Sequence, residues 1–192
     1  MTTSPQVRLQ PVSREDVQRI ADWLEDRDVS DSWYGRDEEG VPIHIAYRPR
    51  EMARATPEVW ADVFLGPDRR LYSIYVDGEG HIGEIQVELE DPLRNAQIFV
   101  LIGRKDVWRQ GYGSTAMARA LDVIFGELQM QRAWADVPEY NRPALGLCQQ
   151  LGFVLEGRLR STRFKDGKWY DSVVMGMLAG EYARRKAAGR VP

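Results

Sequence analysis

The chain has 192 residues, of which 43% are hydrophobic, and its formal net charge is −3. This length and apolar content are typical of one domain with a substantial core, whereas the charge argues against nucleic-acid binding and no apolar run is long enough to cross a bilayer. With a single cysteine, Cys148, neither an internal disulfide nor a cysteine-based zinc site is possible, so we expect a metal-free cytoplasmic protein.

The first predicted elements are a short strand at residues 7–9 and the helix that follows it. Ser13 and Asp16 have the spacing of a capping box, which sets the start of that helix. Apolar residues at helical spacing then mark its buried face, and they are Val17, Ile20, Ala21 and Leu24.

The segment from Glu15 to Glu39 carries many more acidic than basic side chains, and Trp33 and Tyr34 lie within it. A charge run of this kind is typical of a solvated helix face and loop, which we expect for most of these acidic residues. The alternative is an electronegative rim that attracts a cationic substrate, with Asp31 binding the charge and Trp33 or Tyr34 packing against it. Trp33 is equally compatible with a role as a core anchor.

Residues 40–56 contain two prolines and no clear periodicity, which indicates a loop, and we expect it over the substrate side. His44 lies in this loop and is a candidate proton shuttle, although a lone loop histidine is more often incidental. Thr56 and Pro57 then have the pattern of a capped helix start, and Gly66 ends that helix.

Residues 71–76 and 82–89 are predicted strands of a hairpin, joined by a turn that contains glycines. The second strand alternates apolar residues with Glu84, Gln86 and Glu88, so the acidic side chains share one face. Exposure of that face to solvent is the favoured interpretation, and a face turned toward the substrate cleft is the alternative.

A strand predicted at residues 96–103 leads through a turn, called here the glycine loop (residues 103–114), into an amphipathic helix. Gly111 and Gly113 lie in this loop, where the absence of a Cβ lets backbone N–H groups approach a ligand. The helix start adds unpaired N–H groups and a positive dipole end, so a phosphate is the natural ligand. The alternatives are a simple turn or a dinucleotide site, but a dinucleotide site needs further βαβ units, whereas a hairpin follows here.

The last predicted elements are a strand at residues 132–137, a helix capped by Asn141, and a closing hairpin. The hairpin strands are residues 153–164 and 169–178, on either side of a turn with the composition that hairpins favour. A short basic helix at residues 181–186 follows, and we expect it to fray because it ends the chain.

Two blocks of sequence, in this order, resemble the GNAT N-acetyltransferases. The first is Ile-Gly-Arg-Lys-Asp-Val-Trp-Arg-Gln-Gly-Tyr-Gly-Ser-Thr-Ala at residues 102–116, which is similar to the family's acetyl-coenzyme A loop. The second is Asn-Arg-Pro-Ala-Leu-Gly-Leu-Cys-Gln-Gln-Leu-Gly-Phe at residues 141–153. Over residues 70–178 the chain resembles most closely the branch of the ribosomal-protein N-terminal acetyltransferases. Residues 7–35 match loosely, and their tryptophans are similar to those of aminoglycoside 6′-acetyltransferases.

The resemblance implies an α/β GNAT fold, with a mixed, mostly antiparallel twisted sheet of about seven strands and helices on both faces. Acetyl-CoA would be the cosubstrate, held where the strands near residues 101 and 135 splay apart. Strand backbone and Asn141 would bind the pantetheine arm, and N–H groups of the glycine loop would bind the pyrophosphate. The implied cofactor residues are Leu101, Ile102, Gly103, Trp108, Arg109, Gln110, Gly111, Tyr112, Gly113, Ser114, Thr115 and Asn141. The single domain 1–192 would divide into an acceptor-side part (7–70), a cofactor-binding core (71–178) and a tail (179–192).

Asp136 is the first candidate for the general base that deprotonates the attacking amine. It ends its strand shortly before Asn141, where the aminoglycoside enzymes have a base-like aspartate. Pairing with a nearby arginine, or capping of the loop, is the alternative role for this carboxylate. Many family members have a glutamate where this chain has Gln97, so Glu84 and Glu88 are the further catalytic candidates.

Cys148 is the main departure from the family pattern, which has a tyrosine here as general acid toward the leaving thiolate. A cysteine is shorter, and its unperturbed pKa is about 8.5. Cys148 either protonates the thiolate or packs as a small buried hydrophobe, and we favour packing.

The predicted function is therefore transfer of an acetyl group from acetyl-CoA to a primary amine. A small cationic amine fits the acidic N-terminal segment, and a protein N-terminus is the enzymatic alternative. A non-catalytic coenzyme A-binding sensor or partner module is the other alternative, motivated by Cys148 and Gln97. We expect no nucleic-acid or membrane partner, and family habit implies a homodimer through the closing hairpin.

Overall fold

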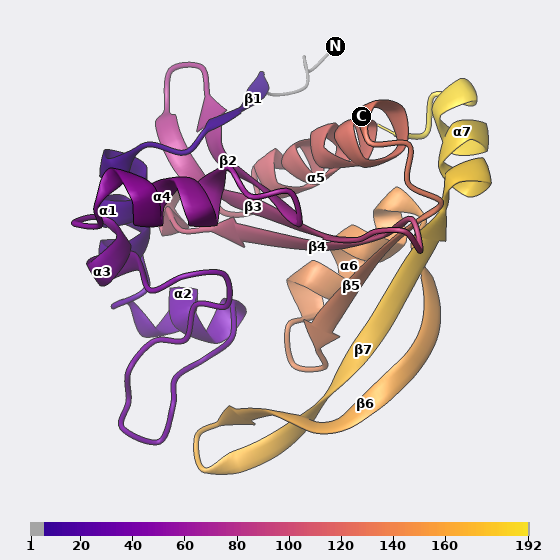
Figure 1. The fold of residues 1–192 in the computed structure, drawn as a ribbon. Helices are drawn as coiled ribbons and strands as arrows, with labels where there is room; N and C mark the ends of the chain where they lie inside the picture. The colour runs from indigo at the N-terminus through magenta and orange to yellow at the C-terminus, as the bar shows by residue number, and fades with distance from the viewer. Residues whose placement is uncertain (1–5, 192) are drawn as a thin grey trace.

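Seven strands form a single sheet in the computed structural model, which describes residues 6–191 (Figure 1). In chain order the strands are β1 (Val7–Pro11), β2 (Arg69–Val76), β3 (Gly80–Glu90), β4 (Asn95–Ile102), β5 (Arg132–Pro138), β6 (Val154–Lys165) and β7 (Lys168–Leu178). Their order in the sheet is β1-β2-β3-β4-β5-β7-β6. Every neighbouring pair is antiparallel except β4 and β5, which are parallel, so the predicted mixed, mostly antiparallel sheet is confirmed.

The helices are distributed along the whole chain. They are α1 (Arg14–Trp23), α2 (Arg27–Ser32), α3 (Pro49–Met52), α4 (Pro57–Phe64), α5 (Tyr112–Asp122), α6 (Arg142–Leu151) and α7 (Ala179–Ala187). A single 3₁₀ turn, η1 (Lys105–Val107), lies in the glycine loop, and a π-helical segment, η2 (Val123–Glu127), continues α5. Among the residues described, no helix combines the length and apolar character needed to span a membrane.

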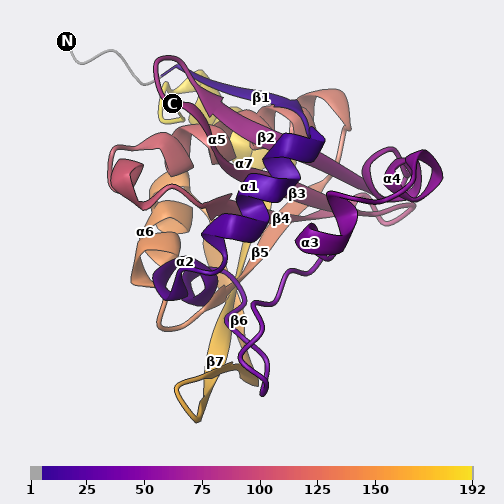
Figure 2. The ribbon, with the colours of Figure 1, turned by 90° about the vertical axis from the view of Figure 1, so that its left-hand side faces the viewer.

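Helices cover both faces of the sheet (Figures 1 and 2). On one face α5, α6 and α7 pack over the larger core cluster, which contains Ile98 of β4 and Leu121 of α5. On the other face α1 and α2 pack against β4 through Ile20, Val29 and Leu101. β4 contributes to both cores because successive side chains of a strand point to opposite faces of the sheet. This strand is therefore rigidly held, and it supplies one wall of the site described below.

α1 begins at the predicted capping box, and Asp16 of that box also ties the helix to the sheet. Ser13 Oγ accepts a hydrogen bond from the Asp16 N–H at 3.2 Å, and Asp16 accepts one from the Ser13 N–H at 3.0 Å. The buried Asp16 carboxylate also accepts hydrogen bonds from Arg19, Ser73 and Tyr75. Burial alone would raise the pKa of this carboxyl, but these hydrogen bonds together hold it well below its usual range.

β4 and β5 pair only over a short stretch and then diverge. Their register joins Asn95–Gln97 to Arg132–Trp134, and no pairing continues beyond Gln97. β3 and β4, by contrast, remain paired up to Ile102. The edge of β4 that faces β5 beyond Gln97 therefore has no strand partner, and an opening is left in the sheet. This confirms the splay predicted between the strands near residues 101 and 135.

The polar face of β3 is buried at Glu84 and Gln86 and half-buried at Glu88, so the favoured prediction of solvent exposure is wrong for the first two. Glu84 and Gln86 are each 1% exposed, because the segment predicted as a loop at residues 40–56, which includes α3, folds over them. His44 Nε2 lies 3.2 Å from Glu84 Oε1, and the Tyr47 hydroxyl donates to the other oxygen of that carboxylate. His44 is thus part of a buried polar cluster and is not an incidental loop residue.

α7 is docked on the core, which corrects the expectation that it frays. Tyr182 is buried against the larger core cluster, and its hydroxyl donates to the carboxylate of Asp122. Lys186 forms an ion pair with the same carboxylate. Asp122 lies 60 residues before Tyr182 in the sequence, and local composition does not reveal such a distant contact.

Candidate active site

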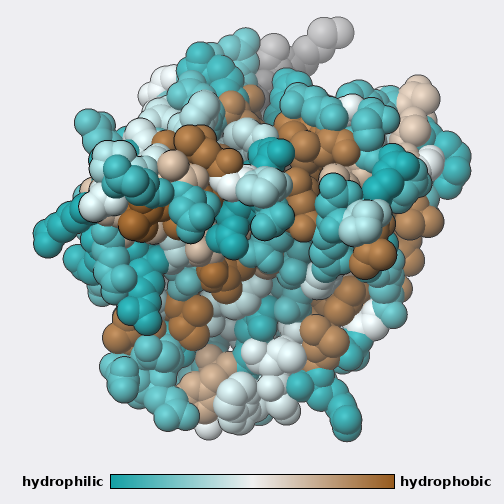
Figure 3. Space-filling model, viewed as in Figure 1, coloured by the Kyte–Doolittle hydropathy of each residue, from teal (hydrophilic) through white to brown (hydrophobic). Residues whose placement is uncertain are grey.

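A cavity of about 640 Å³ opens where β4 and β5 diverge. Its volume lies within the range of small-molecule sites. The loop side of the cavity is lined by residues of the glycine loop together with α6, and the carboxylate side by Trp33, Tyr34, Phe99 and Asp136. Figure 3 shows that apolar side chains on the face viewed as in Figure 1 form several separate patches among hydrophilic ones.

On the loop side, the chain enters α5 through backbone conformations that expose its N–H groups. Gly111 begins the helix in the left-handed region, with a φ of 86°, and Arg109 has a φ of 64°. The backbone N–H groups from Arg109 to Ser114 donate no hydrogen bond to any residue that the structure describes. They lie at the positive dipole end of an 11-residue helix. This arrangement favours an anionic ligand such as a phosphate.

Two indole side chains hold the glycine loop in place. Trp108 Nε1 donates to the Ile102 carbonyl oxygen at 2.9 Å, which fastens the loop to the end of β4. At the start of the loop, a Cβ on Gly103 would lie 2.1 Å from the Trp23 ring, so only glycine fits there. The sequence did not reveal either contact. The strand backbone at Ile102 is predicted to pair with the pantetheine arm, and its carbonyl oxygen already accepts the indole hydrogen bond.

Most of the predicted cofactor residues line the cavity, namely Ile102, Trp108, Arg109, Gly111, Tyr112, Gly113, Ser114 and Asn141. The others do not lie among the described lining residues, and they are Leu101, Gly103, Gln110 and Thr115. Leu101 packs in the core with α1 and α2, and the Thr115 hydroxyl donates to the Gly111 carbonyl at 3.2 Å. A direct contact of these residues with the cofactor stays a prediction.

Asn141 has two structural roles beside the cavity. Its Oδ1 accepts the Ala144 N–H at 3.2 Å, so it caps α6 as predicted. Its Nδ2 donates to the Ser32 carbonyl at 2.8 Å. The second contact, which the sequence did not indicate, joins the end of α2 to the start of α6 across the carboxylate side of the cavity.

Asp136 lies on the carboxylate side and is held by an arginine from the closing hairpin. Arg163 Nη2 donates to Asp136 Oδ2 at 2.6 Å, and both side chains are nearly buried. Asp136 Oδ1 is buried as well and has no hydrogen-bond partner among the described residues. The ion pair matches the alternative role considered for this carboxylate, yet it occupies only one of the two oxygens.

Arg163 was not among the residues singled out from the sequence, and a strand irregularity explains why. The register between β6 and β7 shifts between Leu159 and Arg163, and such a bulge redirects the side chains beyond it. The guanidinium carbon of Arg163 lies 4.4 Å from the centroid of the Tyr34 ring, in a cation–π arrangement. Arg163 therefore connects Asp136 on β5 with the segment after α2.

The other two carboxylates considered as bases lie outside the cavity lining. Glu84 is enclosed in the buried polar cluster with His44, whose ring centroid is 5.7 Å from that of Trp33. Glu88 is half-buried and lies close enough to Tyr34 to contribute to raising the pKa of that phenol, which burial raises most. Of the three carboxylates, Asp136 is the one that lines the cavity.

Cys148 lies on α6 and lines the cavity, where it is 3% exposed. Burial raises the pKa of the Cys148 thiol to about 12. The thiol is therefore protonated throughout the physiological pH range. Because it is also a much weaker acid than an ordinary thiol, it is poorly suited to give up a proton to a leaving thiolate.

Several carboxylates of the acidic N-terminal segment are paired with cations from elsewhere in the chain. Lys105 Nζ lies 3.0 Å from Asp26 Oδ2 and 2.6 Å from Asp28 Oδ2, and Lys165 Nζ lies 2.7 Å from Asp31 Oδ2. The segment is therefore neither a fully solvated face nor a bare electronegative rim. Trp33 is predicted as a core anchor or a substrate contact. It is only 5% exposed, as a core anchor would be, and it also lines the cavity.

Comparison with known proteins gives consistent matches. A family model for the acetyltransferase (GNAT) domain matches residues 6–154. The spermidine N(1)-acetyltransferase of Escherichia coli (strain K12) is 23% identical over 192 residues, which cover 99% of this chain and 96% of that protein. The SPbeta prophage-derived N-acetyltransferase YokL of Bacillus subtilis (strain 168) is 33% identical over 73 residues, and the match spans 38% of this chain and 41% of that protein. The structure of spermidine N-acetyltransferase from Vibrio cholerae in complex with CoA and spermine has a TM-score of 0.77 and 23% identity, covering 93% of this chain and 98% of that one.

Proposed function

Because the chain belongs to the GNAT acetyltransferase family and is an acetyl-CoA-dependent N-acetyltransferase, we propose that its acceptor is a small cationic amine. The observation that carries this proposal is the carboxylate side of the cavity, where Asp136 lies beside the aromatic rings of Tyr34 and Phe99. Carboxylates and the faces of aromatic rings both attract an alkylammonium group. The relatives named for spermidine and spermine support the same class of acceptor.

We place acetyl-CoA on the loop side of the cavity, where the residues present fit its chemistry. When bound, acetyl-CoA supplies an acetyl thioester whose carbonyl carbon an amine can attack, with the coenzyme A thiol as leaving group. The free N–H groups from Arg109 to Ser114 would bind the pyrophosphate. The unpaired edge of β4 beyond Gln97 would hydrogen-bond the amides of the pantetheine arm, and Asn141 would help to orient it.

Asp136 would then act as the general base. A cationic amine must lose a proton before its nitrogen lone pair can attack a thioester, and a carboxylate can accept that proton directly or through a water. Arg163 engages Oδ2, so Oδ1 is the oxygen left to accept the proton. In this scheme Asp136 is the catalytic residue and Arg163 is the positioning residue.

Mass spectrometry of a pooled amine panel tests the acceptor class. We expect acetyl-CoA and the protein to acetylate polyamines or other small cationic amines more than neutral amino acids or short peptides. Acetylated peptides as the main product would favour the alternative, a protein N-terminus. No product on any amine, together with stabilisation of the fold by acetyl-CoA, would contradict the proposal and favour a binding module.

Replacement of Cys148 with alanine is expected to leave kcat within about threefold of the wild type, because a thiol with a pKa of about 12 cannot readily protonate the thiolate. The free energy of unfolding should fall by roughly 1 kcal/mol, because buried side-chain atoms are removed. Steady-state kinetics and urea unfolding measure the two effects. A kcat that drops roughly 100-fold at unchanged stability would assign Cys148 the acid role after all.

Two further expectations stay predictions. The β6 strand at the sheet edge exposes Val154, Leu155 and Leu159, which supports a homodimer through the closing hairpin. The one cysteine is buried and free, which supports a location in the reducing cytoplasm.

A further inference from the structure

The chain places one of its own alkylammonium groups beside the proposed acceptor site. Lys165 Nζ lies 2.7 Å from Asp31 Oδ2 and 5.2 Å from the centroid of the Tyr140 ring. The two charged side chains are 27% and 17% exposed, so the pair is partly withdrawn from water. A carboxylate together with an aromatic face is the usual environment that proteins offer to an ammonium group.

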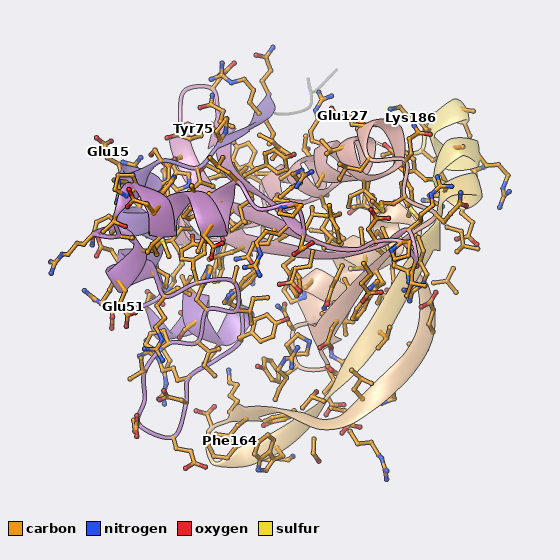
Figure 4. All side chains as sticks on the ribbon, in the orientation of Figure 1. Glu15, Glu51, Tyr75, Glu127, Phe164 and Lys186 are labelled. Atoms are coloured by element: carbon orange, nitrogen blue, oxygen red, sulfur yellow. The ribbon has the colours of Figure 1, made fainter. Side chains whose placement is uncertain are left out.

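The tip of the β6–β7 hairpin brings Lys165 to this position. Other residues near the tip also contact the α2 region, because Arg163 lies over Tyr34 and Asp166 lies 3.8 Å from Arg27. Figure 4 shows Phe164 at this tip, and Figure 1 shows the tip turned toward α2 and the segment that follows it. The hairpin is therefore fastened to the α2 region next to the carboxylate side of the cavity, where Arg163 also pairs with Asp136.

Asp31 and Tyr140 are adjacent in sequence to residues that line the cavity. Asp31 directly precedes Ser32, and Tyr140 directly precedes Asn141. The hydrogen bond from Asn141 to Ser32 joins these two segments at 2.8 Å. An amine whose reacting nitrogen lies at Asp136 could thus extend a second charged group toward Asp31.

We propose that Asp31 and Tyr140 form a subsite for the second ammonium group of a diamine-type acceptor, and that Lys165 occupies this subsite until the acceptor displaces it. The lysine side chain is itself a four-carbon chain that ends in an ammonium group, so it matches the chemistry of the distal half of such an acceptor. This inference rests on the proposed function. It adds that the acceptor carries at least two amines and that Lys165 competes with it.

A purely structural role for the ion pair makes different predictions. If Lys165 only fastens the hairpin to α2, its removal loosens the carboxylate side of the cavity and weakens the binding of every amine alike. If Lys165 competes with the distal ammonium, its removal strengthens the binding of diamines and leaves the binding of monoamines unchanged. Lys165→Met keeps most of the aliphatic chain and removes the charge, so it separates these cases.

The test compares 1,4-diaminobutane with butylamine for the wild type, Lys165→Met, Asp31→Asn and the control Lys168→Met. Lys168 pairs with Lys165 in the hairpin register but lies over Tyr170, and the ion pair of Asp31 is with Lys165. KM is measured with acetyl-CoA, and the Kd of each amine is measured by calorimetry on protein saturated with coenzyme A.

We expect Lys165→Met to lower both constants for the diamine by roughly three- to tenfold, and Asp31→Asn to raise them by about tenfold. Butylamine should be unaffected by either change, and Lys168→Met should affect neither amine.

Equal shifts for both amines, or weaker diamine binding by Lys165→Met, would overturn the subsite while leaving the proposed function intact. If neither amine binds to any of the four proteins, the proposed acceptor class fails and the subsite fails with it. The binding measurement does not depend on turnover, so the two failures can be told apart.

Discussion

Replacement of Gly111 with tryptophan is expected to abolish acetyl-CoA binding, with Kd rising by roughly 100-fold or more. Gly111 begins α5 with a φ of 86° and lines the cavity. A Cβ at this position meets no atom within 4 Å in the protein, so the indole would occupy the space beside the free N–H groups of the loop. Tight binding of a pyrophosphate requires close approach to those groups, and a bulky side chain prevents it.

Backbone strain alone does not account for this expected effect. A non-glycine residue in the left-handed region costs about 1–2 kcal/mol, which a folded domain usually tolerates. Gly78→Trp is the matched control, because Gly78 has a φ of 84°, also has open space around its Cβ position, and lies in the β2–β3 turn. Both variants should lose similar stability, and only the Gly111 variant should lose the cofactor.

Calorimetric titration with acetyl-CoA gives the Kd, and the increase in Tm on adding the cofactor gives an independent measure. The wild type and Gly78→Trp should both be stabilised by acetyl-CoA, whereas Gly111→Trp should not. Unchanged affinity for acetyl-CoA in a folded Gly111→Trp protein would contradict the placement of the pyrophosphate site in this loop.

Asp136→Asn is expected to lower kcat/KM for the amine by roughly 100-fold or more, which is the scale of a lost general base. Asparagine has nearly the same shape as aspartate, and its carbonyl oxygen can still accept the hydrogen bond from Arg163. The cavity should therefore keep its form, and the Kd of acetyl-CoA should change by no more than about twofold. The loss would then lie in the transfer of the proton.

The pH dependence of this variant provides a second readout. Without the carboxylate, the acceptor amine would have to lose its proton to bulk water, so we expect the kcat/KM of Asp136→Asn to recover only as the pH rises toward that at which the free amine deprotonates. Glu139→Gln is the control, because Glu139 also pairs with an arginine, Arg158, but does so near the surface. Turnover at the wild-type rate across the pH range would exclude Asp136 from the mechanism.

The sequence by itself determined the elements whose causes are local. The capping box at Ser13 and Asp16 and the cap at Asn141 depend on hydrogen bonds across three residues, so spacing alone predicts them. The strand, Gly111 and the helix after it form a continuous segment, and the backbone N–H groups that favour an anion all belong to it. The loop side of the cavity could therefore be predicted, along with the family and the order of the strands in the chain.

Only the tertiary structure decided what lies on the carboxylate side. The Asp136–Arg163 pair joins residues 27 apart, and the bulge in β6 that directs Arg163 inward has no signature in the hydrophobic pattern. Likewise, alternation placed Glu84 on the polar face of β3, but only the packing of His44 over that face buried it. The charge run favoured a solvated face and left a substrate rim as the alternative. For Asp31 the structure shows a third outcome, an ion pair with Lys165 on a distant hairpin. Long-range pairing requires the chain to fold back on itself, so the carboxylate side of the cavity forms only in the assembled sheet.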